Sequence, residues 1–237
     1  MKDYTKISIN SEVNKKINSL DKTRENRIEM SKRLKKYNDQ WQFVFFFLNI
    51  EAVIFVVLSL VFNSDVNIDV NHQFGMYSSL FAIYVILLQY YVSNLNYNER
   101  SLKLHYHQLD IEDLILKLKG IMLNISESKQ SNELSTLEER FSAVMYKYQL
   151  LLKSNENHKS IDNKVAIYKK NNRNKNVNKS PVDFEANKNN NESDEERVCN
   201  SSSENEKKPI DYSLDNIFLK INMIVVVMFI LVMMKFL

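Results

Sequence analysis

Residues 43–62 read FVFFFLNIEAVIFVVLSLVF, and only Asn49, Glu51 and Ser59 in this block are polar. A helix rises ~1.5 Å per residue, so about twenty apolar residues cross the ~30 Å hydrocarbon core of a bilayer. The block therefore predicts a transmembrane helix that carries a carboxylate near its middle.

The next apolar block, residues 74–93, predicts a second span. Residues 63–73 between the blocks contain two Asp and no Lys or Arg, whereas residues 1–40 contain eleven Lys or Arg against six Asp or Glu. Because basic residues are retained on the cytoplasmic side, the N-terminus and residues 94–213 are expected in the cytoplasm. We predict a transmembrane hairpin over residues 41–93 with a short external loop.

The rest of the chain predicts further helices and hence an all-α membrane protein. Within residues 1–40, apolar side chains recur at helical intervals between charges and predict a basic cytoplasmic helix. These side chains are Val13, Ile17, Leu20, Ile28 and Leu34. In residues 94–170, two heptad-like seams predict a pair of antiparallel helices joined by the polar segment 126–132. The seams contain Leu104, Ile111, Leu118 and Ile125, and then Leu134, Leu137, Phe141, Val144, Tyr148 and Leu151.

The C-terminal part contains a polar tract followed by an apolar block. After a short helix expected over residues 160–170, with Ser160 as its N-cap, residues 171–213 are mostly Asn, Lys, Glu and Ser. Such a tract buries too little apolar surface to offset its ordering entropy and is expected to be a disordered linker. Residues 214–237 predict a hydrophobic helix. Three interpretations stay open for it: a membrane span, a helix lying on the membrane, and a helix docked on the hairpin.

The composition argues against an enzyme. Two Gly in 237 residues do not supply the Gly-rich loops that cradle phosphates or dinucleotides. Cys199 is the single cysteine, and His105 and His107 are two residues apart, so they point to different helix faces rather than to one metal. The net charge of +3 is too small to indicate nucleic acid. We expect no catalysis, no cofactor, no metal and no direct nucleic-acid binding.

Glu51 is the main candidate functional residue, because a charge at the centre of a lipid-facing helix costs roughly 3 kcal/mol or more. Asn49, Tyr84 and Gln89 are the other intramembrane polar candidates. In one interpretation Glu51 is uncharged and bonded inside the hairpin, with the Tyr84 hydroxyl as its partner. In a second, Glu51 and Asn49 line a water-filled path formed when several hairpins associate. In a third, the membrane tolerates a lone glutamate.

Three stretches carry a resemblance to a known family. They are RIEMSKRLKKYNDQWQF (27–43), YVSNLNYNERSLKLHYHQLDIEDLILKLK (91–119) and ENHKSIDN (156–163). Together with the order of basic helix, two-span hairpin, long charged helix and short helix, they resemble the SLATT family, small two-span membrane effectors of bacterial conflict systems. The resemblance covers about residues 11–170.

Within the last stretch, Asn157, His158 and Asp162 resemble a cluster of the family branch associated with reverse transcriptases, and they form a candidate cytoplasmic site. The resemblance implies a multi-pass inner-membrane protein that oligomerises and forms a pore or disrupts the membrane once triggered, as in antiviral defence by abortive infection. It implies as partners the bilayer, further copies, and a reverse transcriptase or nucleotide-second-messenger system encoded nearby. The rival hypothesis is a non-conducting membrane tether that pairs through its coiled-coil-like helices.

The charge asymmetry leads to a prediction about topology. With Cys199 replaced by serine, a cysteine introduced at Ile68 should react with a membrane-impermeant maleimide added outside the cell, because its loop is expected there. A reporter fused after Leu237 should also be external if the last helix spans. Labelling of position 68 from the cytoplasm alone would overturn this topology.

Overall fold

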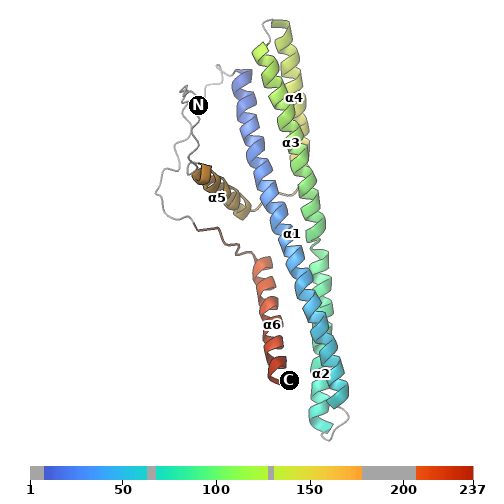
Figure 1. The fold of residues 1–237 in the computed structure, drawn as a ribbon. Helices are drawn as coiled ribbons and strands as arrows, with labels where there is room; N and C mark the ends of the chain where they lie inside the picture. Colours follow the sequence, from blue (N-terminus) through green and yellow to red (C-terminus); the bar gives the residue numbers. More distant parts are fainter. Residues whose placement is uncertain (1–7, 63–67, 128–130, 178–206, 237) are drawn as a thin grey trace, which may run out of the picture.

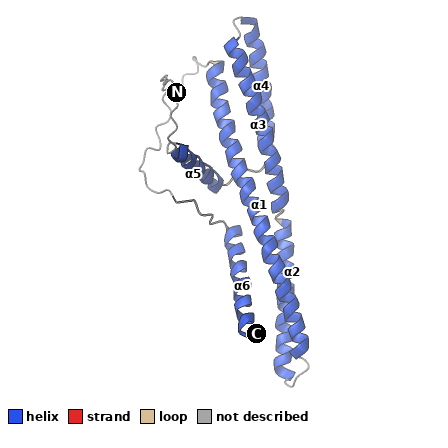
Figure 2. Cartoon of the chain, viewed as in Figure 1, coloured by secondary structure: helices blue, strands red, loops and turns tan. Residues whose placement is uncertain are grey.

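The computed structural model of the chain describes residues 8–62, 68–127, 131–177 and 207–236. Every regular element in these ranges is a helix (Figure 2). The helices are α1 (Ile9–Phe62), α2 (Ile68–Asn94), α3 (Tyr97–Glu127), α4 (Ser131–Lys153), α5 (Ser160–Val177) and α6 (Leu214–Phe236). The predicted all-α fold is confirmed.

α1 is a single helix of 54 residues that contains both the predicted basic helix and the first predicted span. No Gly or Pro occurs between its ends, so no residue in it removes a backbone hydrogen bond or strongly favours a break. Ser8 caps its start, where Oγ accepts the N–H of Ser11 at 3.2 Å. The two halves of the molecule are therefore joined by one continuous rod.

α2 and α3 return along α1 as a second, nearly continuous rod (Figure 1). They are separated only at Leu95 and Asn96, and Asn96 adopts a left-handed φ of 48°, which Asn tolerates better than most residues. α2 begins at Ile68, inside the loop predicted between the spans. Residues 63–67 of that loop lie outside the described residues.

Away from the apolar blocks, the first part of α1 packs with α3 and α4 into a three-helix bundle, which we call the distal bundle (Figure 1). The predicted seam of α3 enters its core through Ile111 and Leu118, whereas Leu104 is buried in the core of the apolar half. α4 and α1 contribute the remaining buried side chains, which include Leu137, Val144, Tyr148, Val13 and Leu20. The structure thus adds α1 as a third helix to the predicted pair.

α5 lies against the middle of α1 and ends at Val177 rather than at Lys170. Residues 178–206 of the predicted linker lie outside the described residues. α6 follows and packs beside the apolar half of α1 (Figure 1), where its Phe218 and Phe229 rings contact two aromatic rings of α1. α6 is therefore docked on the hairpin.

Three stretches are long and apolar enough to cross a membrane, within Ile9–Leu60, Gly75–Ile125 and Leu214–Leu231. They include both spans of the predicted hairpin and α6. An all-helical chain with these stretches is a membrane protein.

The buried seam leads to a prediction about stability. Leu118 is 0% exposed, whereas Leu150 on α4 is 48% exposed. Leu118→Ala should lower the free energy of unfolding by about 3 kcal/mol, because it loses buried methyl groups and leaves a cavity. Leu150→Ala is the matched control and should change it by less than about 0.5 kcal/mol. Denaturant unfolding of the full chain in detergent, followed by circular dichroism, measures both; equal effects would contradict a core at Leu118.

Candidate functional site

Glu51 is 3% exposed and lies on the face of α1 that meets two other helices. Leu48 precedes it by three residues and Phe55 follows it by four, so the three side chains share one side of the helix. The Phe55 ring contacts Phe81 of α2 at 5.2 Å and Phe229 of α6 at 4.8 Å between centroids. Glu51 therefore lies on the packed side of α1, which α2 and α6 cover, and not on the outer surface.

Neither carboxyl oxygen of Glu51 has a hydrogen-bond partner among the described residues. The Tyr84 hydroxyl, which the sequence suggested as the partner, instead donates to Asn222 Oδ1 of α6 at 2.6 Å. The expected Glu51–Tyr84 bond is therefore wrong, because α6 brings a buried amide to a hydroxyl that has a single proton to give. A buried polar group without a partner costs roughly 1–3 kcal/mol, and more if it is charged.

The other two intramembrane candidates bond to each other. Gln89 Nε2 of α2 donates to Asn49 Oδ1 of α1 at 3.0 Å, and the Asn49 side chain lies on the exposed side of α1. The sequence analysis missed Asn222, although it is the single polar residue in the apolar run 221–234. Three of the four predicted residues thus have partners, and Glu51 is set apart from them.

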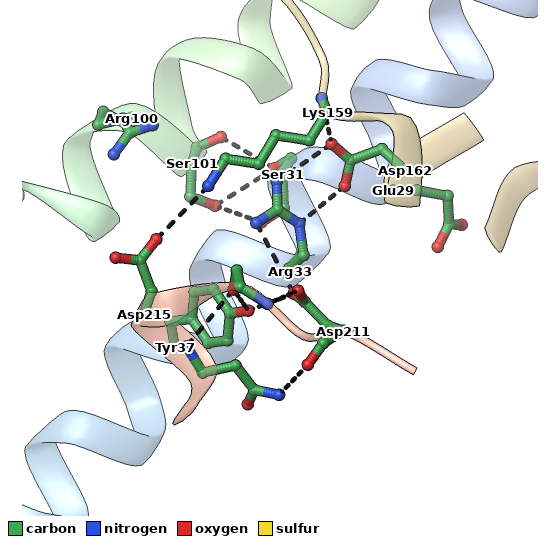
Figure 3. A network of polar contacts seen from close by, with 12 residues as sticks. Glu29, Ser31, Arg33, Tyr37, Arg100, Ser101, Lys159, Asp162, Asp211 and Asp215 are labelled. Atoms are coloured by element: carbon green, nitrogen blue, oxygen red, sulfur yellow. Dashed lines mark hydrogen bonds and ion pairs between the residues drawn. The ribbon is translucent and has the colours of Figure 1, made fainter. Parts of the chain in front are cut away.

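A polar network lies where the apolar half of the molecule meets the distal bundle, and it joins α1, α3, α5 and the start of α6 (Figure 3). At its centre Arg33 Nε and Nη2 donate to the two carboxylate oxygens of Asp162, at 2.8 and 3.1 Å. Asp162 also accepts the backbone N–H of Lys159 at 2.9 Å, which closes the first turn of α5. Lys159 rather than Ser160 is therefore the N-cap of α5. Burial opposes the charge of Arg33, yet its bonds to Asp162 raise the pKa of this guanidinium.

The segment that leads into α6 is bound to the same network, and we call these contacts the α6 latch (Figure 3). The Tyr37 hydroxyl donates to the Asp211 carboxylate, and Arg33 lies 3.9 Å from the same carboxylate. Lys159 Nζ lies 3.5 Å from Asp215 in the first turn of α6. Burial, followed by the bond to Asp211, raises the pKa of Tyr37 to about 12, so the phenol keeps its proton and remains a donor. α5 and α6 are thus held by neighbouring residues of α1.

The predicted cytoplasmic cluster does not converge on one site. Asp162 binds Arg33, whereas His158 Nε2 lies 3.3 Å from Asn26 Nδ2 on an earlier turn of α1. Asn157 is exposed. Two of the three predicted residues therefore fasten the α4–α5 connection to α1. Across the described ranges, no three His, Cys, Asp or Glu side chains gather as metal ligands would.

Two further buried groups, Arg27 and His107, were missed from the sequence as site residues. The Arg27 guanidinium is buried between helices and donates to the backbone carbonyl of Glu156. His107 of α3 is 2% exposed, and neither ring nitrogen has a hydrogen-bond partner among the described residues. Burial, and then the charge of Arg27, lower the pKa of His107 to about 4. The imidazole is therefore neutral at pH 7, whereas His105 lies on the exposed face of α3, as its spacing predicted.

The buried imidazole predicts a pH-dependent stability. Because folding lowers the pKa of His107 from 6.5 to about 4, the unfolded chain binds more protons between these pH values, and stability falls as the pH drops from 6.5 towards 4. His107→Gln should reduce the fall in the free energy of unfolding between pH 6.5 and 4 by up to about 3 kcal/mol. The exposed His105→Gln should retain it. Denaturant unfolding at several pH values gives the slopes; an unchanged slope in His107→Gln would contradict a buried neutral imidazole.

Comparison with known proteins places this architecture in a family. The model of the SMODS and SLOG-associating 2TM effector domain family 5 matches residues 9–234. The match begins with α1 and extends through α6, so it also covers the linker and the C-terminal helix, which the resemblance over residues 11–170 did not include. No curated protein and no solved structure matches the chain. The chain belongs to the SMODS and SLOG-associating 2TM effector domain family, the SLATT family that its sequence resembles.

Proposed function

We propose that this protein is a membrane effector of a bacterial antiphage system that associates with further copies in the inner membrane and permeabilises it once triggered. The observation that carries the proposal is Glu51, a buried carboxyl group whose two oxygens have no partner among the described residues. Ionisable residues within membrane spans are expensive and mark ion or proton paths. Membership in a family of two-span effector domains supports the class of function. The proposed action needs no catalytic step.

The described arrangement corresponds to the resting state of such an effector. Glu51 lies on the face of α1 that α2 and α6 cover, so it does not reach another copy while α6 stays docked. Phe229 of α6 contacts Phe55 one turn beyond Glu51, and Asn222 holds the Tyr84 hydroxyl of α2. Separation of α6 from this face would free Glu51 to line a path between associated hairpins.

The trigger is proposed to act on the distal side of the α6 latch. Asp162 of α5 binds Arg33, which also faces Asp211 before α6. A partner that pulls α5 from α1 would therefore remove the counter-charge of Arg33 and disturb the start of α6 at the same time. A reverse transcriptase or a nucleotide-second-messenger system encoded nearby is the proposed source of this signal.

Substitution of Glu51 tests the proposal. Rings of carboxylates attract cations in channels, so Glu51→Gln should reduce the cation preference of the leak, and Glu51→Leu should abolish leak and toxicity. Ser59→Ala is the control, because within the described ranges the hydroxyl of Ser59 bonds to the carbonyl of Val56 in its own helix. Membrane potential and survival are followed after induced expression, with membrane abundance checked for each variant.

Two outcomes would contradict the proposal in different ways. Full depolarisation by Glu51→Leu at equal abundance would refute the pore-lining role of the carboxylate. An unchanged potential with the wild-type protein and its activating partner system would favour the non-conducting tether instead.

A further inference from the structure

α3 carries a second heptad on the face opposite to its buried seam. Leu102, Leu109 and Leu116 follow one another at intervals of seven residues, and they are 52%, 44% and 59% exposed. Leu123 continues the same spacing and is 64% exposed. We call these four residues the leucine stripe. A straight helix keeps residues seven apart on nearly the same side, so the stripe forms one narrow apolar line along α3.

The charged residues beside the leucine stripe indicate that it does not face lipid. α3 belongs to the distal bundle, and charged side chains border the stripe on both sides: Lys103, Asp110, Glu112, Asp113, Lys117 and Lys119. An exposed apolar line rimmed by charges on a soluble helix marks an interaction surface. Its seven-residue period is the period of a helical partner in a coiled coil.

We propose that two copies of this chain pair through the leucine stripe, as a parallel two-stranded coiled coil of their α3 helices. Copies in one membrane share one orientation, and their hairpins hold both α3 helices at the same depth. Two such helices are therefore parallel and in register, so each leucine of one copy meets the same leucine of the other. This pairing rests on the proposed function in one respect, because that function requires copies to associate.

The charges beside the stripe fit a second copy. With the leucines at heptad position d, Glu112 occupies position g and Lys117 occupies position e of the next heptad. In a parallel coiled coil these two positions face each other across the interface, so Glu112 of each copy faces Lys117 of the other. One heptad earlier, His105 at position g faces Asp110 at position e of the other copy. Glu112 also pairs with Arg24 of its own α1 at 3.2 Å, yet its side chain remains 49% exposed and within reach of a partner.

The a positions make the contact weak enough to be reversible. Glu99, Tyr106, Asp113 and Gly120 occupy them beside the four leucines, and Glu99 and Asp113 would each face the same residue of the other copy, where like charges oppose pairing. A full zipper would have apolar residues at these positions. The pairing is therefore expected to depend on the high local concentration that a membrane provides.

Cysteine cross-linking in the full chain tests the pairing. In membranes that contain the Cys199→Ser chain, Leu109→Cys and Leu116→Cys should each form a disulfide-linked dimer on mild oxidation, because facing d positions bring their Cβ atoms close. Glu139→Cys, on the exposed side of α4, is the control and should remain monomeric. Equal linking at all three positions, or linking at position 139 alone, would overturn the proposal. So would a linked product with the mass of a different protein.

Two further variants test whether the linked fraction depends on the residues of the proposed interface. With Leu116→Cys as reporter, Asp113→Leu should increase the linked fraction at least about three-fold, because it replaces opposed charges with an apolar a pair. Leu102→Glu together with Leu109→Glu should reduce it by a similar factor. Each of these residues is exposed, so the distal bundle should stay folded, as circular dichroism will show. No response to either change would overturn the pairing.

Failure of this interface can be distinguished from failure of the proposed function. Depolarisation by a chain whose stripe cysteines never link would refute this interface and leave the effector function standing. Linking at the stripe without any depolarisation would support the interface and favour the tether.

Discussion

The continuity of α1 is the constraint on which the rest of the structure depends. A helix of 54 residues without Gly or Pro reaches from the distal bundle through the apolar half, and α2, α3, α5 and α6 all contact it. Because α1 is one uninterrupted helix, the residues that contact α3, α4 and α5 and those that contact α2 and α6 belong to the same element. The architecture therefore links the distal bundle to the part that holds Glu51.

The polar network sits at the midpoint of this rod. Ser31 and Ser101 each donate a hydroxyl hydrogen bond to the carbonyl of the other at 2.9 Å, which holds α1 and α3 at close approach. Arg33 and Asp162 form a bidentate ion pair on the next turn. Buried ion pairs add little net stability, because desolvation offsets most of the attraction, yet the loss of one partner leaves an expensive unpaired charge. The loss of either Arg33 or Asp162 is therefore more costly than the net stability that the pair supplies.

The apolar half differs from the distal bundle in how it uses polar residues. Asn49 with Gln89, and Tyr84 with Asn222, satisfy one another across helix boundaries, as polar residues in membrane bundles do. Neither Glu51 oxygen has such a partner among the described residues. Its burial therefore destabilises the described arrangement relative to one in which the carboxyl group is hydrated or hydrogen-bonded. On α3, the buried imidazole of His107 has a cost that grows as the pH falls, because burial disfavours its protonated form.

The sequence by itself determined the helical class and the presence of three apolar stretches long enough to cross a membrane, because apolar length and periodicity report directly on burial in a bilayer or a core. It also singled out Glu51, since an ionisable residue in an apolar run is visible without neighbours. Contacts between distant segments have no local signal. The pairing of Arg33 with Asp162, of Tyr84 with Asn222 instead of Glu51, and the burial of His107 depend on which helices meet and at what rotation. The heptad of Leu102, Leu109 and Leu116 was present in the sequence, but only the tertiary structure showed that α1 and α4 cover the other face of α3 and leave these leucines outside.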